Sequence, residues 1–410
     1  MADLAIETQR QGGKSWFVAP QPGSPFVNGR GRPAMVDLFA ALPPNERPTV
    51  VAPAVGPMFE FGTAAYRSSV YAAALQSGVP AGVPVIVSND ADTWAAAAYL
   101  SPRNPMIAVL HGNHVINDGL VQQYGKAAAA IACVSTRVNR RTEALDRPGR
   151  PPLVTIPCGI PMQPSPSRPA QSVGPLRMAW IGRMNEDEKR VSDLPKIAAQ
   201  LRDAGLSFTL DLMGDGPARD SLSRAFDVLD LGDCVRMHPW SPTNEVLDLL
   251  ARSDILLMSS NSEGMSITVM EALSMGCGIV SSRVSGVEDY ESRSAANSCL
   301  WIFDIGDVPG AVEKIRAASR VPSLVRAAAA RSLAASEFSI SVCAQRYADL
   351  LTRLAPTESV GRVALDAART LTALASFPVA AQRLARLYLT GHHGRSTTPA
   401  QSVPSMSQVA

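Results

Sequence analysis

The stretch at residues 260–280 reads SNSEGMSITVMEALSMGCGIV, and it follows the short apolar run ILLM at 255–258. The apolar run predicts a buried strand, and the helical spacing of the apolar residues beyond the turn predicts a helix. Two glycines end this helix, and the chain then enters a second strand. This order places Glu263 in the turn between strand and helix, and Glu271 about two turns into the helix.

The turn before this predicted helix suits an anionic ligand. A helix N-terminus presents free N–H groups and the positive end of a dipole, which both favour a phosphate. Gly264 has no side chain that would keep a ligand away from the backbone. Carboxylates accept hydrogen bonds from vicinal hydroxyls, so Glu263 and Glu271 could hold the two sugars at opposite ends of a diphosphate. The alternative is a helix-capping acid and a surface glutamate, and this spacing alone fits both interpretations.

Two further segments carry glycine turns after predicted strands. Residues 178–190 read MAWIGRMNEDEKR, with a strand at 178–181, a glycine and then basic residues. Residues 208–217 read FTLDLMGDGP, a strand that ends in Gly-Asp-Gly. Together with the Glu-Gly turn and the later glutamate, these segments resemble the C-terminal half of retaining glycosyltransferases of family four, which have the GT-B fold. The resemblance covers roughly residues 175–351.

The resemblance implies a role for each matching residue. It implies that Arg183 and Lys189 hold a donor diphosphate, that Glu263 contacts a hydroxyl of the donor sugar, and that Glu271 contacts the ribose. A solvated, charged loop is the alternative for the two basic residues. The full set of implied site residues comprises the catalytic Glu263, His111, Arg183 and Lys189, and the donor-binding Gly182, Gly214, Gly264, Met265, Ser266 and Glu271.

His111 ends a predicted strand that points into a cleft. In the resemblance it matches the histidine of the family's N-terminal domain that contacts the sugar or the acceptor near the reacting carbon. A satisfied loop histidine is the alternative. The neighbouring Asn113 and His114 have weaker claims to a role.

Asp90 and Asp92 form an Asp-x-Asp pair that opens a predicted helix. We interpret the pair as helix-capping chemistry and not as a metal site, because aspartate is a common N-cap. We expect no metal and no other cofactor, since two basic side chains supply positive charge for the diphosphate. Glu288 matches a family position near the nucleotide, although the usual double glycine before it is Ser285-Gly286 here, which puts that role in doubt.

The composition is that of a globular protein. The chain has 410 residues, of which 46% are hydrophobic and 18% charged, which is enough for two or three domains. A net charge of +2 argues against a nucleic-acid partner. The six cysteines show no Cys-x-x-Cys spacing, which favours a reducing, cytoplasmic setting over a zinc site or a disulfide framework. We find no apolar run of about 18 residues that would span a membrane.

Strands alternate with helices along most of the chain, which predicts two Rossmann-like, doubly wound α/β domains facing each other across a cleft. We expect an N-terminal acceptor-side domain at 1–159, a Pro/Ser/Gln-rich linker at 160–174, and a nucleotide-sugar-binding domain at 175–340. Residues 341–390 are expected to form the family's crossing helix, which returns toward the first domain, and a helical extension. Residues 391–410 are expected to be a disordered tail.

The predicted helices of the extension, at 361–374 and 379–389, carry four arginines. One interpretation is a peripheral contact with the inner face of a membrane. The other is a helix that packs on the protein or covers its surface.

The resemblance implies transfer of a glycosyl unit from a nucleotide-diphospho-sugar to a glycan, lipid-linked or small-molecule acceptor, with retention of configuration. No side chain in the motifs is an obvious nucleophile, which fits front-face attack assisted by the leaving phosphate. One alternative is a sugar-nucleotide epimerase or hydrolase, which would need an acid/base carboxylate in the N-terminal domain. Another is a non-catalytic or impaired nucleotide-sugar-binding protein. A dehydrogenase is poorly supported, because no Gly-x-Gly-x-x-Gly follows a first strand.

The beginning of the chain departs from the family pattern. The family's first domain opens with a buried strand and a Gly-rich loop, whereas residues 2–11 already predict a helix and residues 15–19 match the second strand. We therefore expect the first strand and its loop to be missing. An unfilled position should then lie in the N-terminal sheet beside the strand that ends at His111, with poor solubility or low activity as the result.

Overall fold

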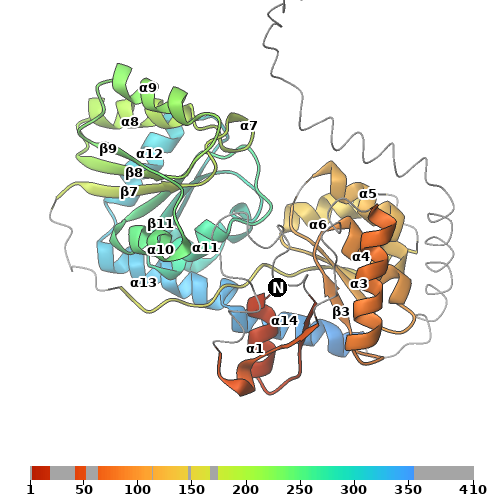
Figure 1. The fold of residues 1–410 in the computed structure, drawn as a ribbon. Helices are drawn as coiled ribbons and strands as arrows, with labels where there is room; N and C mark the ends of the chain where they lie inside the picture. The colour runs from red at the N-terminus through yellow and green to blue at the C-terminus, as the bar shows by residue number, and fades with distance from the viewer. Residues whose placement is uncertain are drawn as a thin grey trace, which may run out of the picture.

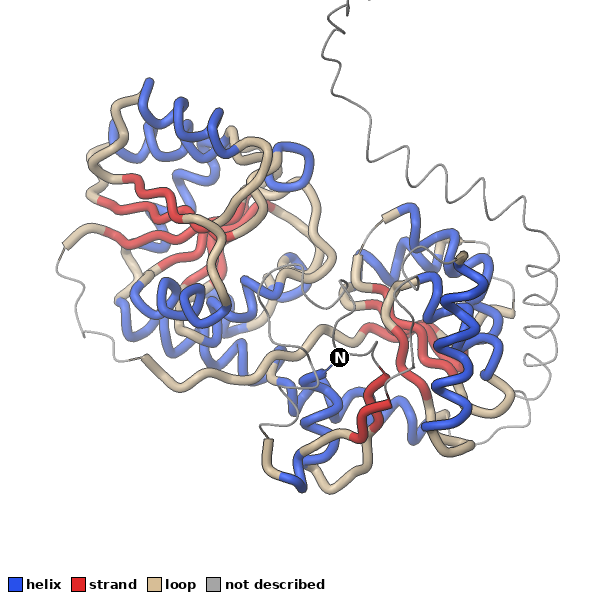
Figure 2. The backbone as a smooth tube through the Cα atoms, viewed as in Figure 1, coloured by secondary structure: helices blue, strands red, loops and turns tan. Residues whose placement is uncertain are grey.

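The computed structural model describes residues 2–18, 42–51, 63–112, 114–145, 149–166 and 174–354. Asn113 and the extension and tail at 355–410 therefore lie outside the described residues, and the predictions for them stay predictions. The described chain forms two parallel α/β units with helices against their sheets (Figure 1, Figure 2). This confirms the predicted class of two doubly wound domains.

The C-terminal sheet contains six parallel strands in the order β12-β11-β10-β7-β8-β9. Their bounds are β7 Leu176–Ile181, β8 Phe208–Met213, β9 Val235–His238, β10 Ile255–Met258, β11 Gly278–Ser282 and β12 Leu300–Phe303. From β7 the chain adds β8 and β9 on one side, and it then returns to place β10 on the other side of β7. The direction of winding thus reverses between β7 and β10, and ligands of doubly wound sheets bind in the crevice beyond such a reversal.

Helices cover both faces of this sheet (Figure 1). One face packs against α8 Asp193–Asp203, α9 Arg219–Val228 and α12 Val308–Ser319, and the other against α10 Thr243–Arg252, α11 Ile267–Ser274 and α13 Ser323–Leu333. Each face has its own cluster of buried apolar side chains. Shorter helical turns lie at α7 Glu186–Lys189, Glu288–Tyr290, Ser294–Ser298 and Ala334–Phe338. The one-turn helix α7 was not predicted, because four residues are too few for an apolar period to be seen.

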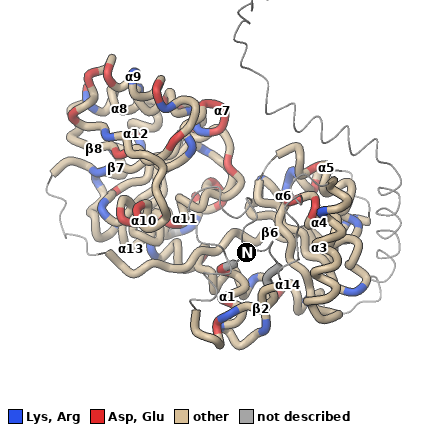
Figure 3. Tube along the Cα trace, in the orientation of Figure 1, with Lys and Arg blue, Asp and Glu red and all other residues tan. Residues whose placement is uncertain are grey.

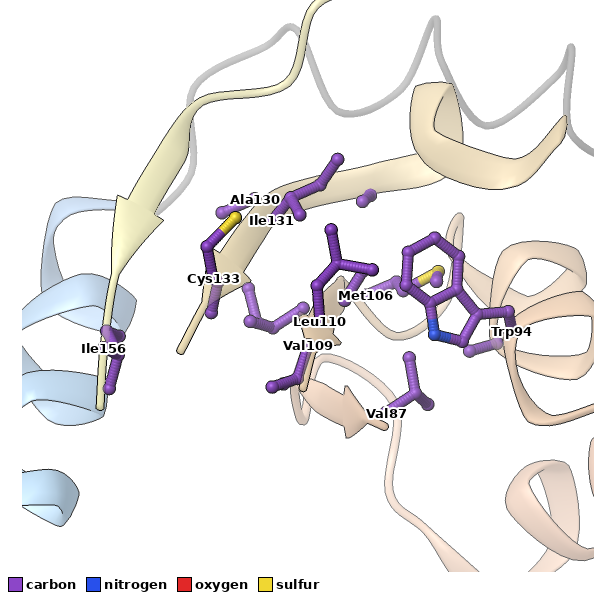
Figure 4. Packing of buried hydrophobic residues seen from close by; sticks show 14 of the residues in the cluster. Val87, Trp94, Met106, Val109, Leu110, Ala130, Ile131, Cys133 and Ile156 are labelled. Carbon is purple, nitrogen blue, oxygen red and sulfur yellow. The ribbon is translucent and has the colours of Figure 1, made fainter. Parts of the chain in front are cut away.

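The N-terminal sheet has four parallel strands in the order β3-β4-β5-β6. Its strands are β3 Val85–Val87, β4 Met106–Leu110, β5 Ala128–Cys133 and β6 Leu153–Thr155, and its helices are α3 Ala64–Gly78, α4 Ala91–Leu100, α5 Val115–Tyr124 and α6 Thr136–Glu143. Every residue of β4 is buried, as expected for a strand inside a parallel sheet. Trp94 of α4 packs fully buried against this sheet (Figure 4) and donates its indole N–H to the Ser88 carbonyl at 2.8 Å.

Helix α14, Ile340–Arg353, ends the described chain and packs into the N-terminal core. It buries Tyr347 and Leu350 there, and it contacts α1, Ala2–Arg10. Ile160 joins the same region, because its N–H donates to Phe338 and its carbonyl accepts from Ile340, both at 2.8 Å. Ile160, the first residue of the predicted linker, is therefore hydrogen-bonded to the start of α14.

The N-terminal sheet is interrupted, although not where we expected. Strand β4 is hydrogen-bonded to β3 and to β5, so the prediction of an unfilled position beside the strand that ends at His111 is wrong. Among the described residues, β1 Trp16–Val18 pairs with β2 Thr49–Val51 alone, and β3 pairs with β4 alone. A cavity of about 360 Å³ is lined by β1 and β3 and by residues of α1 and α3, so the interruption lies between β1 and β3.

Candidate active site

The predicted donor-binding residues follow three strands of the C-terminal sheet at their carboxyl ends. Gly182 to Lys189 follow β7, Gly214 follows β8, and Glu263 to Ser266 follow β10. Because β7 is hydrogen-bonded to both β8 and β10, these loops converge at the reversal of the winding direction. Figure 3 shows charged positions gathered at α7, in the loop after β7.

Lys189 and Glu263 form an ion pair between Nζ and Oε1. The Ser260 hydroxyl donates to the same carboxylate oxygen at 2.7 Å. Only 19% of the Lys189 side chain and 12% of the Glu263 side chain are exposed, so this lysine does not belong to a solvated loop. A charged pair at this depth is held by local hydrogen bonds and screened less by water than a surface pair.

Main-chain contacts fix the position of this pair. The Asn185 side chain caps α7 by accepting from the Lys189 N–H at 3.2 Å. The Ser259 hydroxyl donates to the Lys189 carbonyl at 2.8 Å, and the Asn261 N–H donates to the Glu188 carbonyl at 2.8 Å. The turn after β10 is thus tied directly to the helical turn after β7.

Arg183 lies in the same loop and is exposed, and its guanidinium forms no ion pair with any described residue. Close by, the turns after β7 and β8 touch through their backbones: a Cβ at Gly214 would stand 1.9 Å from the Gly182 carbonyl oxygen. Gly214 is therefore required by close approach, whereas a Cβ at Gly182 would make only ordinary contacts, the nearest at 3.5 Å. Arg219 was missed by sequence reasoning, and it holds this region by donating to the carbonyls of Gly214 at 2.7 Å and His238 at 3.0 Å.

Helix α11 begins later than predicted. Ser266 is its N-cap residue and Ile267 its first helical residue, so Glu271 lies about one turn into the helix and not two. Ile267 is 45% exposed, and the buried face of the helix starts at Val269 and Met270.

The N-terminal domain meets this turn through His111, which follows β4. A Cβ at Gly264 would stand 1.8 Å from the His111 carbonyl oxygen, so the two segments are in backbone contact. The His111 Nδ1 lies 3.6 Å from the Cys158 sulfur. Burial lowers the pKa of His111 to about 4 and raises the pKa of the Cys158 thiol, so both groups are neutral near pH 7.

Two asparagines hold the loop after His111, and sequence reasoning missed both. The buried Asn117 side chain donates to the Gly112 carbonyl at 2.5 Å, and the Asn89 side chain donates to the Asn117 side-chain oxygen Oδ1 at 3.2 Å. A polar residue on the buried side of the predicted helix 115–124 was the available signal. His114 is exposed and precedes α5 without a side-chain cap.

Asp90 and Asp92, the Asp-x-Asp pair, each contact a residue of their own domain. Asp90 caps α4 by accepting from the Thr93 N–H at 3.0 Å, which confirms the capping interpretation. Asp92 forms an ion pair with Arg67, while its burial raises its pKa. Both carboxylates are thus occupied, which weakens the epimerase or hydrolase alternative. No cluster of three metal-ligating side chains was found in the described ranges.

Glu288 has a partner in the N-terminal domain. Its carboxylate forms a two-point ion pair with Arg137 of α6, at 2.8 Å and 2.6 Å. In this structure the Glu288 carboxylate is therefore engaged in an interdomain ion pair, whereas we expected it near a nucleotide.

Two doubly wound sheets that meet at such a site define the GT-B fold. The solved structures agree. Sucrose-phosphate synthase from Thermosynechococcus elongatus superposes with a TM-score of 0.63 at 14% identity, over 86% of this chain and 91% of that chain. HepE from Anabaena, solved with UDP and glucose, superposes with a TM-score of 0.60 at 14% identity, over 83% of this chain and 99% of that chain.

The sequence comparisons match the C-terminal domain to a family. Residues 175–319 match the family model described as glycosyl transferases group 1. The amylovoran biosynthesis glycosyltransferase AmsK of Erwinia amylovora is 28% identical over 192 residues, which are 44% of this chain and 46% of AmsK. The C-terminal domain thus matches the group 1 glycosyl transferases, and the GT-B fold agrees with that match. It spans less than half the length of AmsK. Within the described residues, no helix is both long and apolar enough to cross a bilayer.

Proposed function

We propose that this protein transfers a glycosyl unit from a nucleotide-diphospho-sugar to an acceptor hydroxyl with retention of configuration. The observation that carries the proposal is the Lys189–Glu263 pair at the reversal of the sheet, with the exposed cation of Arg183 in the same loop. The binding of UDP and glucose by HepE, which shares the fold, supports a nucleotide sugar as the donor class.

In this proposal the diphosphate takes Lys189 and Arg183 as its counter-charges. Lys189 exchanges the Glu263 carboxylate for a phosphate oxygen, and Glu263 becomes available to accept a hydrogen bond from a sugar hydroxyl. Ser260 keeps the carboxylate in place while its ionic partner changes, because its hydroxyl bonds to the same oxygen at 2.7 Å. Donor binding thereby assembles the sugar contact.

The reaction then breaks the bond between the anomeric carbon and the leaving phosphate oxygen. The electron pair goes to the diphosphate, where the preorganised charges of Lys189 and Arg183 stabilise it. The acceptor oxygen bonds to the anomeric carbon on the same face, and its proton passes to the departing phosphate oxygen. The two basic side chains fill the role of a metal, so we propose that transfer proceeds in the presence of a chelator.

His111 completes the proposed site from the acceptor side. A neutral imidazole beside a forming glycosidic bond can donate or accept one hydrogen bond without adding charge. Its contact with Gly264 places it next to the turn that carries Glu263. We therefore propose that His111 orients a hydroxyl of the donor sugar or the acceptor.

The test combines binding with turnover. The purified protein is incubated with a panel of uridine and guanosine diphosphate sugars, and its melting temperature and the release of nucleoside diphosphate are measured with and without a chelator. We expect one donor to stabilise the wild type and to be turned over in both conditions. Stabilisation by no donor, together with no release, would contradict the proposal.

A second candidate is a nucleotide-sugar-binding protein without turnover. The interruption between β1 and β3 favours it, because this sheet supports His111 and the acceptor side. The same experiment separates the two: stabilisation by a donor without release of nucleoside diphosphate, across a panel of acceptors, would support binding alone.

A further inference from the structure

The N-terminus of α6 is bonded across the domain interface to the segment after β11. The Thr136 N–H donates to the Asp289 carboxylate at 2.7 Å, which supplies the acceptor that a helix N-terminus requires. Next to it, Arg137 holds Glu288 at two points and also donates to the Arg283 carbonyl at 3.3 Å. These contacts join residues about 150 positions apart in the sequence.

Ser285 lies at the centre of this interface. Its hydroxyl oxygen is 2.6 Å from that of Ser135, the N-cap residue of α6, and both serines are 1% exposed. It also lies 3.2 Å from the Gly264 carbonyl oxygen, in the turn that carries Glu263. One buried hydroxyl thus touches both the N-terminal domain and the candidate site.

The hydrogen bonds from Val138 through Ser135 and Ser285 to Gly264 form one chain, in which each donor points to the next residue. The Val138 N–H donates to the Ser135 oxygen at 3.3 Å, as part of the cap of α6. Because the Gly264 carbonyl can only accept, the Ser285 proton must point to it. The Ser135 proton then points to the Ser285 oxygen, and every donor and acceptor in the chain is satisfied. Successive bonds of this kind polarise one another in a buried environment.

The adjacent glycine explains why only one of the two residues differs from the family's double glycine. Gly286 has a φ of +78°, and a Cβ there would stand 2.9 Å from the Gly264 carbonyl oxygen. Position 286 therefore requires glycine for both conformation and space. Position 285 accommodates a serine, whose hydroxyl bonds across the domains.

We propose that Ser285 is a positioning residue that couples the contact between the two domains to the geometry of the turn at 263–266. Ser285, Ser135, Arg137 and Glu288 form what we call the interdomain clasp. Through the clasp, α6 fixes the Gly264 carbonyl, and with it the turn that carries the Glu263 carboxylate. The kinetic consequence rests on the proposed function, whereas the structural coupling does not.

The test compares Ser285→Ala with Ser281→Ala. Ser281 is a matched control, since it is fully buried in β11, just before the segment that carries Ser285, and donates locally, to the Ser282 carbonyl. Hydrogen exchange is measured by mass spectrometry on peptides that cover 263–266 and 136–138. Loss of one buried hydrogen bond is worth about tenfold in a local opening equilibrium. We expect roughly tenfold faster exchange in both peptides for Ser285→Ala, and no such change there for Ser281→Ala.

Arg137→Gln provides a second variant that spares the buried core, because 37% of the Arg137 side chain is exposed. It should speed exchange at 263–266 as well, although Arg137 does not touch that turn. Unchanged exchange at 263–266 in Ser285→Ala and in Arg137→Gln, with both variants folded, would overturn the coupling. If transfer is measurable, Ser285→Ala should lower kcat by several-fold with little change in donor KM. Absence of transfer in the wild type would contradict the proposed function alone, because the exchange result would stand.

Discussion

Gly264 lies against the backbone of His111, so closely that a Cβ at position 264 would stand 1.8 Å from the His111 carbonyl oxygen. The contact joins the turn after β10 in the C-terminal sheet to the end of β4 in the N-terminal sheet. Both partners are main chain, so neither can move aside as a flexible side chain would. The two segments of the candidate site can therefore lie in contact only because residue 264 is a glycine.

Gly264→Ala should therefore disturb the site without unfolding either domain. The added methyl group forces the turn and the His111 loop apart, and displacement of a reacting group by about 1 Å can cost about 10²-fold in rate. We expect glycosyl transfer to fall by at least about tenfold. Gly232→Ala is the matched control, because a Cβ there meets nothing within 4 Å. Equal transfer activity of the two variants would show that the contact between Gly264 and His111 does not matter for the reaction.

The two glutamates of the site should separate in their kinetic effects. Glu263→Gln removes the charge that we propose lies beside the donor sugar, where charge develops in the transition state, so it should mainly lower kcat. Glu271→Gln lies on α11 and should mainly weaken donor binding through the ribose. Titration of free nucleoside diphosphate against each variant checks this. Loss of affinity in the Glu263 variant, with wild-type affinity in the Glu271 variant, would reverse the assignment.

His111 should make stability depend on pH. Its pKa is about 4 in the folded protein and about 6.5 in an unfolded chain, so between these values the unfolded chain takes up a proton that the folded protein does not. Stability contributed by neutral His111 is therefore present above pH 6.5 and is lost as the pH falls toward 4. The melting temperature of His111→Gln should fall less steeply than that of the wild type over this range. Parallel curves would mean that burial does not lower this pKa.

Sequence patterns predicted most of the α/β alternation, because strands such as β10 and β4 are continuous apolar runs of fixed length. They also placed Glu263 in a turn, since Glu-Gly follows such a run. They could not supply the Lys189–Glu263 pair, whose members are 74 residues apart and meet because β10 lies beside β7. The partner of Ser285 is 150 residues away and depends on how the domains meet.

The position of the interruption in the N-terminal sheet was mispredicted for a similar reason. The order of strands in a sheet depends on tertiary contacts, and the amino-acid composition of β3 and β4 does not predict that they pair. In β3 the Val85 N–H donates to Pro105 on the β4 side, so by alternation the Ile86 N–H points to the other side, toward β1.

The Ile86 amide should therefore exchange with solvent faster than the Ile107 amide. Ile107 lies in β4 and is flanked by β3 and β5, so its backbone is paired on both sides. Residue-resolved hydrogen exchange by NMR measures both amides in one sample. Equal protection of the two amides would show that the edge of β3 is covered.

The central claim is that a donor diphosphate binds at Lys189 and Arg183, and calorimetric titration of nucleoside diphosphate into Lys189→Ala tests it most directly. Lys196→Ala is the control, since Lys196 pairs with Asp193 on α8 and its side chain is 60% exposed. Removal of a charged phosphate contact is worth about 3 kcal/mol, so we expect Lys189→Ala to bind at least about 10²-fold more weakly and to lose kcat/KM in proportion. The control should match the wild type. Wild-type affinity in folded Lys189→Ala would contradict the account.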